Sequence, residues 1–495
     1  MRKNKTYLLY AFLACLALSV SRPAAAADAD TAPRQEPEIV SITECVKLTV
    51  ENNFDVKLAK LDFLIAGTEE SYAEAVFDTF IQGDVNYTED RLRPLSVFGS
   101  EHSRTNVYSG GFTKELPTGT TLDLSLSDTR SWSDSSYVSQ NPAHTAEATL
   151  TATQPIGKNF FGYVDRQNIT VTRLAIMNSD LDTKDRIEAA IAEVEKAYWR
   201  WVLLKASLVI YHEMLEKARH LNEVNRRSFD MGRIEKGDLY ASEANVVIRQ
   251  KDMRMAETRV RNSEERLKLI MNMDAGTRID TRAVLSHHEL KVTLEDCLET
   301  AFAERRDYKK AKRDVEMKNI VFKMKANERW PEIDLVGTMT MNGIDSGVDE
   351  AISNLVDETN ARYYAGIQVS IPLENNKAIS EYDKAKFRKE KAIVDVKRVE
   401  RDIVTQIGNG LRDYDTYVIT MQSLKEAAEL QGDKLSEEEK SFSYGRSDTK
   451  WLIDYQHDYL RARLDYLLGI YDVEASRIDL ERAMNILLEK YKGLL

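Results

Sequence analysis

The nine prolines of this 495-residue chain leave two very long segments without proline. The prolines lie at positions 23, 33, 37, 94, 117, 142, 155, 331 and 372, so the free segments are residues 156–330 and 373–495. A proline inside a helix costs about 3 kcal/mol because it removes a hydrogen bond and clashes with the preceding turn. Long helices must therefore avoid proline, and both segments can hold them.

Both free segments carry heptad patterns typical of packed helices. Apolar residues follow a four-three spacing at Ile187, Ile191, Val194, Tyr198, Trp201, Leu208 and Leu215, and again at Leu460, Leu464, Leu467 and Tyr471. A second line beside the first contains Ala190, Ala197, Leu204, Tyr211 and Ala218. Each seam needs a partner helix to bury it, so two seams indicate neighbours on both sides. We expect helices from about Tyr163 to Asp230 and from about Lys377 to Phe442, each roughly 100 Å long at 1.5 Å per residue.

Period-two alternation marks two other regions, about 80–155 and 332–372. In the first, the apolar or small members are Ile81, Gly83, Val85, Tyr87, Leu122, Leu124, Leu126, Ala146, Ala148, Leu150 and Ala152. In the second, Ile367, Val369 and Ile371 alternate with Tyr364, Gly366, Gln368 and Ser370. Alternation of this kind is typical of a half-buried strand. It fits a membrane barrel, whose apolar face meets lipid, and it fits an ordinary surface sheet equally well.

The N-terminus has the layout of a secretory signal peptide. Three basic residues precede the apolar stretch Tyr7–Val20, and the alanines at 24–27 offer a cleavage site. Residues 1–27 are therefore predicted to be removed. The alternative, a lipoprotein signal at Cys15, is disfavoured because this cysteine lies inside the apolar stretch and follows a poor lipobox.

The remaining chain is acidic and contains few cysteines. The net charge is −12, and loss of the leader removes four basic residues and no acidic one. We expect no binding to nucleic acid, because phosphate contacts need clustered Lys and Arg. Cys45 and Cys297 are too few for a disulfide framework in a chain of this length. We interpret both as buried thiols.

The two halves of the chain repeat each other in the same order. The sequence S-F-D-M-G-R at 228–233 recurs as S-F-S-Y-G-R at 441–446, and the stretch 44–59 aligns without gaps to 296–311. A proline precedes each long helix, at Pro155 and Pro372. We predict two repeats, residues 28–290 and 291–495, each with one long helix pair. The first has extra residues that include Gly110 to Asp128, interpreted as an additional β-hairpin at the extracellular end or in the barrel.

This ordered duplication resembles the TolC family of outer-membrane efflux proteins over essentially the whole mature chain. The segment Met231 to Leu239 looks like the first helix tip of that family. The resemblance implies a mainly α fold with a long antiparallel α-helical barrel and a membrane β-barrel shared by a trimer, built from two structural repeats. It also implies an outer-membrane location with most of the chain in the periplasm. The implied partners are two further copies in a homotrimer, a periplasmic adaptor (membrane fusion) protein, an inner-membrane pump and outer-membrane lipid.

In such proteins the helix tips form the inner end of the duct, which is closed at rest and contacts the adaptor. By match, the tips are residues 228–238 and 441–454. The implied gate and adaptor residues are Gly232, Arg233, Asp238, Gly445, Arg446, Trp451 and Asp454. The second tip departs from the family pattern, since a tryptophan, residue 451, stands where an aspartate is often found.

Each tip residue also has a plain structural interpretation. The two glycines would serve as helix C-caps in the left-handed conformation. Asp238 would cap the following helix, and exposed arginines at a turn are often only solvated. These roles are compatible with a gate or adaptor role.

The sequence contains no convincing catalytic, metal-binding or cofactor-binding set. His287-His288-Glu289 has no second ligand pair at helical metal spacing and is interpreted as a solvated linker. There is no phosphate loop, no nucleophile elbow and no CxxC motif. The chain is therefore not expected to be an enzyme or to hold a cofactor.

The leading hypothesis is a passive outer-membrane channel of a tripartite export system, which carries efflux or secretion substrates delivered by the pump. The alternative is a periplasmic coiled-coil scaffold protein without a pore. A general porin is disfavoured by the very long helices. Drugs, metal ions and proteins all use ducts of this shape, and the lack of a Met-rich or His-rich run is evidence against a dedicated metal exporter.

Overall fold

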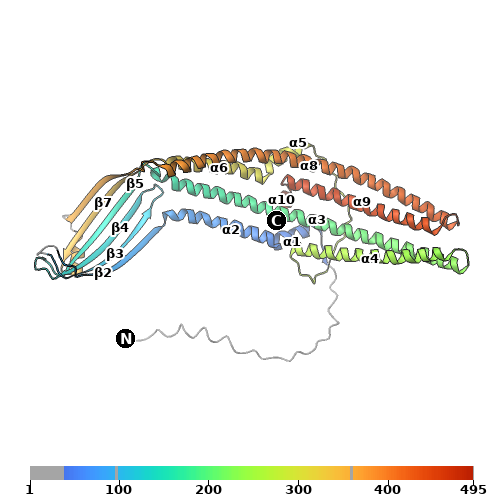
Figure 1. The fold of residues 1–495 in the computed structure, drawn as a ribbon, viewed down its shortest axis with the longest axis horizontal. Helices are drawn as coiled ribbons and strands as arrows, with labels where there is room; N and C mark the ends of the chain where they lie inside the picture. The colour runs from blue at the N-terminus through green and yellow to red at the C-terminus, as the bar shows by residue number, and fades with distance from the viewer. Residues whose placement is uncertain (1–37, 95–98, 357–359, 494–495) are drawn as a thin grey trace, which may run out of the picture.

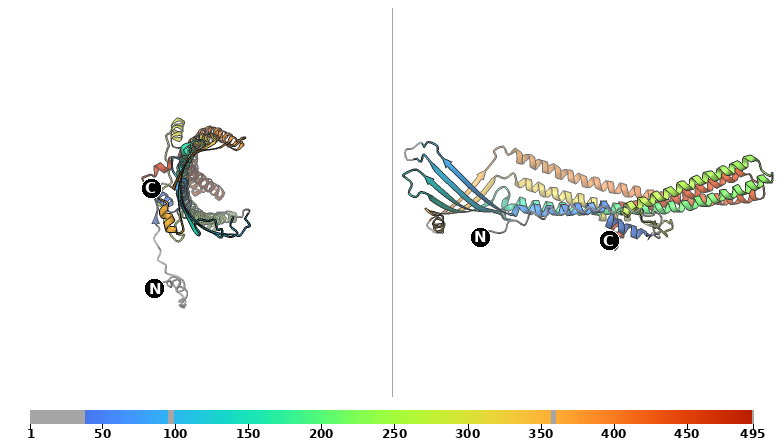
Figure 2. Two further views of the ribbon diagram at one scale, coloured as in Figure 1. Left: turned by 90° about the vertical axis from the view of Figure 1, so that its left-hand side faces the viewer. Right: turned by 90° about the horizontal axis from the view of Figure 1, so that it is seen from below.

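The computed structural model describes residues 38–94, 99–356 and 360–493 as one elongated wall of long helices with a β-sheet at one end (Figure 1). The predicted signal peptide, residues 1–27, lies outside the described residues. End-on, the wall is curved like the letter C (Figure 2). It therefore has a concave and a convex side.

The helices of the wall follow the duplicated order that the sequence predicts. The first set is α1 (Ile42–Asn52), α2 (Phe54–Glu74), α3 (Tyr163–Asp230) and α4 (Lys236–Met271), and the second is α5 (Leu294–Glu304), α6 (Arg306–Asn327), α8 (Asn376–Ser443) and α9 (Thr449–Ala483). The short helices are η1 (Ala75–Phe77), η2 (Phe160–Gly162), α7 (Val348–Asn354) and α10 (Leu487–Lys490). Both α3 and α8 contain 68 residues, so equivalent positions lie 213 residues apart. The predicted long helices are confirmed to within one residue at each end.

Six antiparallel strands form the sheet. They are β2 (Thr79–Asp90), β3 (Ser103–Glu115), β4 (Thr121–Ser133), β5 (Ala143–Pro155), β7 (Glu332–Asp345) and β8 (Ala361–Ser370), in the spatial order β2-β3-β4-β5-β7-β8. The residues between Gly110 and Asp128 lie in β3, β4 and their turn, inside this sheet. Strands β2 and β8 are the two edges, and neither has a second neighbour among the residues of one chain that the structure describes.

The strand register gives the sheet one apolar and one polar face. One row across all six strands is Ile81, Phe112, Leu124, Leu150, Met339 and Tyr363. The next row is Gln82, Gly111, Ser125, Thr149, Thr340 and Arg362. Successive side chains of a strand point to opposite faces, so the predicted alternation is realised as two whole faces.

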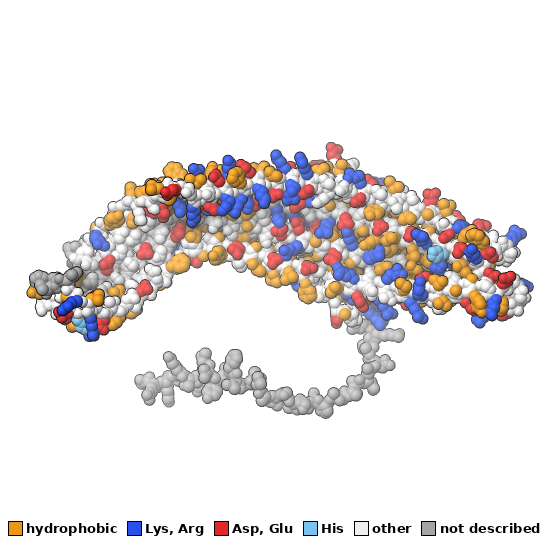
Figure 3. All heavy atoms as spheres, in the orientation of Figure 1, with side chains coloured by type: hydrophobic (Ala, Val, Ile, Leu, Met, Phe, Trp, Pro, Cys, Tyr) orange, Lys and Arg blue, Asp and Glu red, His pale blue; other side chains and the backbone are white. Residues whose placement is uncertain are grey.

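The apolar face is the convex one. Helix α7, which the sequence analysis did not anticipate, lies on the convex side (Figure 2) and packs against β7 at Gly343, where an added Cβ would come within 2.0 Å of the Ala351 carbonyl oxygen. Gly343 pairs with Ala146 and shares its face. The concave face, seen in Figure 3, carries mostly uncharged side chains over the sheet and mixed charges over the helices.

The two halves also share their local end signals. Helix α1 begins with a capping box of Ser41 and Glu44, and α5 begins with one of Thr293 and Asp296. In such a box the hydroxyl and the carboxylate satisfy backbone N–H groups that the helix leaves unpaired. The same sequence signal therefore defines the first helix of each repeat.

The main apolar core lies at the middle of the wall, where α1, α4, α9 and α10 meet α3. Its largest fully buried side chains include Trp201, Tyr198 and Ile191 of α3. A second core buries Cys297 against α8 and α9. Cys45 and Cys297 are 0% and 1% exposed, and burial raises the pKa of the Cys45 thiol to about 12. Both cysteines are thus buried thiols, as predicted.

A two-residue parallel pair crosses this middle region, which we call the equator. It joins β1 (Glu38–Ile39) to β6 (Ile279–Asp280), so the start of the described chain is tied to the linker between the halves. Lys205 of α3 donates to Asp280 and holds the pKa of that carboxyl below its usual range. The convex side of the equator therefore carries the linker, α1, α5 and the C-terminal turn (Figure 2).

Candidate functional site

The first helix tip is a glycine turn with a Schellman pattern. Gly232 has φ +67° and donates its N–H to the Phe229 carbonyl at 2.8 Å, and the Arg233 N–H reaches the Ser228 carbonyl at 2.8 Å. These two bonds satisfy carbonyls that the end of α3 leaves free. No atom lies within 4 Å of a Cβ added at Gly232. The positive φ, and not crowding, is therefore what requires glycine.

The second tip repeats the same backbone. Gly445 has φ +69°, its N–H donates to the Phe442 carbonyl at 3.0 Å, and the Arg446 N–H donates to the Ser441 carbonyl at 2.9 Å. The interpretation of both glycines as C-caps is thus supported by the geometry. Arg233 and Arg446 are exposed beside them, and the Arg446 guanidinium lies 5.8 Å from the centre of the Tyr444 ring.

The starts of the two return helices differ. At α4 the N-cap position is Glu235, whose side chain makes no capping bond, and Asp238 lies in the first turn. At α9 the N-cap is Asp448, whose carboxylate accepts the Trp451 N–H at 3.1 Å. Asp238 is therefore not the N-cap residue, but its charge in the first turn favours the positive end of the helix dipole.

Trp451 is the structural counterpart of Asp238, because each is the third helical residue after its tip. The indole is 50% exposed and lies 6.0 Å, centre to centre, from the ring of Tyr455. Asp454 is exposed one residue before that tyrosine. The second tip thus presents an aromatic surface where the first presents a carboxylate.

A buried asparagine ties the two tips together. Asn225 of α3 is 1% exposed, and its amide donates to the Thr449 hydroxyl of α9 at 2.9 Å and to the Asp238 carbonyl of α4 at 3.4 Å. One side chain therefore contacts both return helices. This residue is not among those predicted from the sequence, because a lone polar residue in a heptad carries no signal without its neighbours.

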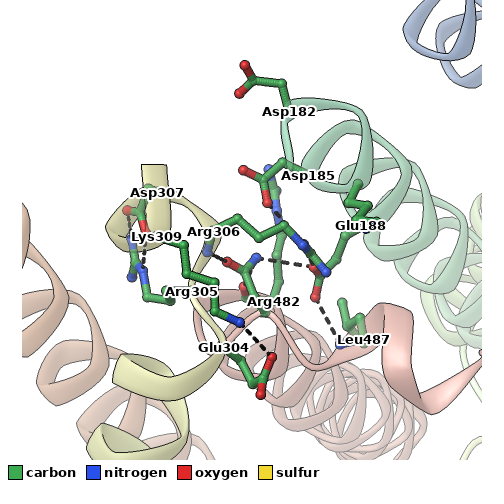
Figure 4. Close-up of polar contacts among 12 residues, drawn as sticks. Asp182, Asp185, Glu188, Glu304, Arg305, Arg306, Asp307, Lys309, Arg482 and Leu487 are labelled. Carbon is green, nitrogen blue, oxygen red and sulfur yellow. Dashed lines mark hydrogen bonds and ion pairs between the residues drawn. The ribbon is translucent and has the colours of Figure 1, made fainter. Parts of the chain in front are cut away.

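The equator contains the most deeply buried charges. Figure 4 shows Glu188 of α3 between Arg306 of α6 and Leu487 of α10. Its carboxylate, 1% exposed, accepts from the Arg306 guanidinium and from the Leu487 N–H, the latter at 2.9 Å. The Arg306 guanidinium also donates to Asp185 at 3.0 Å, although burial raises the pKa of Asp185. Glu188 thus joins three helices from both halves of the chain.

About two helical turns further along α3, a second buried carboxylate accepts a hydrogen bond from the C-terminal turn. Glu195 is 0% exposed and accepts from the Tyr491 hydroxyl. Arg477 of α9 donates to Glu474 at 2.9 Å and to Glu481, and lies 3.7 Å from Glu195. Burial raises the pKa of Glu195. This network fastens the C-terminal turn to α3 and α9.

His288 of the linker joins the same network from outside. Its backbone N–H and its Nδ1 lie 2.6 and 3.1 Å from Glu474 Oε1, while its side chain is 71% exposed. The interpretation of this segment as a linker holds, but its contact with a buried glutamate was not expected. Nothing here resembles a metal site, and within the described residues no group of three potential ligands converges.

A polar pocket opens beside Glu188. It has a volume of about 440 Å³ and is lined by Asp185, Glu188, Arg305, Asp307, Gln406, Asp479, Arg482, Ala483 and Asn485. Its lining contains both acidic and basic side chains, and most of them are ion-paired: Arg305 with Asp307 at 2.6 Å, Asp185 and Glu188 with Arg306, and Asp479 with Lys196. We interpret the pocket as a by-product of the ionic joint between α3, α6 and α9.

Among the described residues, no helix is apolar enough over a sufficient length to cross a membrane.

Comparison with known proteins supplies the context for this geometry. Residues 120–273 match the family model described as "Outer membrane efflux protein". No curated protein matches the chain. Similar solved structures include CusC, in a study of folding and transmembrane channel formation, which is 14% identical with a TM-score of 0.68 and covers 95% of this chain and 99% of its own.

Two further structures are similar over nearly the whole wall. The CmeC outer membrane channel of Campylobacter jejuni is 15% identical with a TM-score of 0.67, and the match covers 95% of this chain and 94% of CmeC. The open state of the MtrE outer membrane channel of Neisseria gonorrhoeae is 13% identical with a TM-score of 0.66, covering 90% and 88%. At these identities the likeness establishes the fold.

Proposed function

We propose that this chain is a member of the outer membrane efflux protein family and forms the passive outer-membrane duct of a tripartite export system. It lies in the outer membrane, with most of its length in the periplasm. The predicted fold class is confirmed by the likeness to solved outer-membrane channels. The similar solved structures are outer-membrane channels. We propose that this chain is also a channel and that it has no catalytic activity of its own.

The observation that carries the proposal is a curved wall with two unsatisfied edges. Open sheet edges are not tolerated in lipid, because their N–H and C=O groups would have no partner. The edge strands β2 and β8 end the sheet of one copy. The apolar convex face supports insertion in lipid and argues against the scaffold alternative. Cyclic association of three copies, each pairing β2 with the next copy's β8, closes the sheet without leaving an edge.

The helical edges carry matching apolar stripes. On α8, Phe387, Val394, Ile419 and Leu430 are 62–64% exposed. At 100° per residue they lie on the face opposite to the buried Ala385, Ala392, Ile403 and Met421. On the other edge, α2 exposes a heptad seam of Phe54, Leu58, Leu61, Ile65 and Tyr72. A seam of this kind needs a partner helix, and the edge of a second copy supplies one.

The charges of the two edges are complementary along the wall. Helix α2 carries five acidic and two basic residues, whereas residues 376–402 of α8 carry nine basic and six acidic ones. Below the equator the signs reverse, since α4 carries eight basic and six acidic residues and residues 403–443 of α8 carry four basic and eight acidic ones. Opposite potentials favour one docking register over others. These patterns support a homotrimer.

The duct then runs from the membrane sheet to the helix tips. The tips, with Gly232, Arg233, Asp238, Gly445, Arg446, Trp451 and Asp454, lie at the end opposite to the sheet (Figure 1). We assign this end to the periplasmic adaptor and, through it, to an inner-membrane pump. In this proposal the duct has no cofactor and no catalytic site, so the energy for transport comes from the pump. The pump also selects the cargo.

Assembly is tested by a disulfide between the edges. We expect Leu61→Cys together with Val394→Cys to give a covalent trimer under oxidising conditions, with no crosslink from either variant alone. The native thiols do not interfere, since Cys45 and Cys297 are 0% and 1% exposed. The readout is the ladder on a denaturing gel of outer-membrane fractions. A monomeric protein in the soluble periplasmic fraction would overturn the channel and support the scaffold.

Export is tested by comparing a deletion strain with its parent in one experiment. Increased susceptibility to dyes, detergents or antibiotics with unchanged secretion would indicate small-molecule efflux. Loss of individual secreted proteins without increased susceptibility would indicate protein secretion. Complementation with the L61C/V394C variant, before and after oxidation, connects either phenotype to the trimeric duct.

A further inference from the structure

The two repeats contribute unequally to the sheet. The second supplies β7 and β8, whereas the first supplies β2, β3, β4 and β5. Equal contributions would have given two strands from each repeat. The additional hairpin β3–β4 lies between β2 and β5, in the middle of the first repeat's share.

The hairpin is built into the sheet along its whole length. Every residue of β2 is paired with one of β3, and eleven residues of β4 are paired with β5. Its faces continue those of the neighbours, since Phe112 and Leu124 join the apolar row and Gly111 and Ser125 join the polar row. A hairpin that only covered the extracellular mouth would leave β2 and β5 free to pair with each other.

The turn of the hairpin is anchored at the helical end of the sheet. Gly119 has φ +74°, and an added Cβ would come within 2.4 Å of the Gly162 backbone nitrogen. The Arg166 guanidinium, from the first turn of α3, donates to the Pro117 carbonyl at 2.6 Å. The Gln154 amide of β5 donates to the Thr118 carbonyl at 3.1 Å. The hairpin thus spans the sheet from its outer end to the start of the long helix.

We infer that the β3–β4 hairpin widens the outer-membrane pore, so that the duct passes solutes that a barrel with four strands per copy would exclude. This inference rests on the proposed trimeric function. Six strands per copy give eighteen in a closed trimer, in place of twelve. Barrel diameter grows roughly in proportion to strand number, so the pore is about half as wide again.

The polar lining agrees with a wide aqueous passage. On the concave face, the hydroxyls of Thr149 and Thr340 lie 3.2 Å apart and those of Thr151 and Thr338 lie 3.3 Å apart. Thr113 of the hairpin donates to Asp123 at 2.6 Å on the same face. These side chains are short and bonded to one another along the sheet, and therefore leave the lumen open. A barrel of 16–18 strands is of the size that holds a water-filled channel.

The hairpin can be removed without changing the rest of the sheet. Row pairing places Ile81 and Leu150 in the same apolar row, with Phe112 and Leu124 between them. Strands β2 and β5 run in opposite directions, since three antiparallel pairings separate them. Deletion of residues 103–142 therefore lets β2 pair directly with β5 and keep its apolar face outward.

The experiment measures the pore width from the cell exterior. A reporter cysteine replaces Thr153, at the helical end of β5 on the polar face, in the full chain and in the chain lacking residues 103–142. Intact cells are treated with maleimide-polyethylene glycols of graded mass, and the labelled fraction is read as a gel shift. We expect the full chain to be labelled by polymers about 1.5 times as wide as the largest one that labels the shortened chain.

Two controls separate the possible failures. A variant that shortens only the loop 134–140 tests whether loss of an extracellular plug changes the labelling, and we expect the cut-off of the full chain. Heat-resistant trimers in the outer-membrane fraction must be present for both chains. No trimer from the full chain overturns the proposed function itself, whereas two trimers with the same cut-off overturn only the widening. If the shortened chain does not assemble, the barrel diameter of the full-chain trimer in end-on electron micrographs decides between twelve and eighteen strands.

Discussion

The long helices α3 and α8 have the same length and end in the same turn, but they carry different side chains at the equator. Both contain 68 residues and finish in the same glycine turn. Where α3 has the buried Glu188 and Glu195, the equivalent positions of α8, 213 residues later, are Arg401 and Gly408. The backbone of the repeat is therefore kept while its buried charges are not.

The difference follows from which chain segment each helix must hold. The C-terminal turn docks on α3 through the Leu487 N–H and the Tyr491 hydroxyl, both received by glutamates. The linker between the halves docks on α8 through the Leu290 N–H, which the neutral Tyr414 hydroxyl accepts at 2.7 Å. The two equivalent helices thus use different hydrogen-bond acceptors, carboxylates on α3 and a hydroxyl on α8, because different segments dock on them. The repeat therefore preserves the shared backbone and not the side chains that contact these segments.

The largest test of this comparison is Glu188→Ala. It leaves the buried Arg306 guanidinium without its main partner, and we expect a loss of about 3–5 kcal/mol in the free energy of unfolding. Arg401→Ala, the equivalent change in α8, strands no buried group and should cost less than about 1 kcal/mol. Urea unfolding of the detergent-solubilised protein measures both. Equal losses would show that the equators are alike despite their sequences.

Substitution of the glycine should destabilise the protein equally at the two tips. At Gly232 and Gly445 an alanine must adopt positive φ, which costs about 1–2 kcal/mol at each site because of the clash between Cβ and the following carbonyl. The matched control is Gly237→Ala in the first turn of α4, where φ is ordinary and nothing lies within 4 Å of the new Cβ. Thermal unfolding midpoints should fall for the two tip variants and not for the control. A loss at one tip alone would contradict their shared backbone.

Substitution of the N-cap residue should destabilise the two return helices, α4 and α9, unequally. Asp448→Ala removes a capping bond to the Trp451 N–H and should cost about 1 kcal/mol. Glu235→Ala removes no capping bond and should leave stability nearly unchanged. Hydrogen exchange at the first turns of α9 and α4 reports each effect locally. Faster exchange in α4 of the second variant would contradict the difference between the tips.

The smallest effect concerns pH. Because burial raises the pKa of Glu195, the folded state binds a proton more tightly than the unfolded state does. The stability linked to this proton is present below the unfolded pKa and is lost as pH rises through the folded pKa. Glu195→Gln should therefore reduce the fall in unfolding midpoint between pH 5 and pH 8. Glu193→Gln, an exposed neighbour, should leave the slope unchanged, and an identical slope for both variants would mean that Glu195 does not titrate there.

The sequence allowed the skeleton to be predicted because its signals are local. Proline marks where the long helices cannot run, and glycine with positive φ marks where α3 and α8 end. Alternation predicted the strands, although the sequence could not distinguish a lipid-facing sheet from a surface sheet. That distinction needed the register, which joins residues as distant as Leu150 and Met339 in one apolar row.

The candidate site was predictable only in part. The turn residues stand at the tips as expected, while their gate and adaptor roles stay predictions. Asn225 and Asp448 were not identified, because the bond of Asn225 to Thr449 spans 224 positions and the capping role of Asp448 depends on where α9 begins. The buried charges at the equator were missed for the same reason. A glutamate in a heptad resembles a solvated residue until its partner from another segment is known.

The repeated glycine turn has a consequence for counting. In a trimer, the backbone of the turn occurs six times around the ring, since each chain contributes it twice. The side chains that follow it occur in two sets of three, one with Asp238 and one with Trp451. A partner that recognises the turn alone therefore encounters a ring of six similar sites, whereas one that recognises the indole or the carboxylate encounters three.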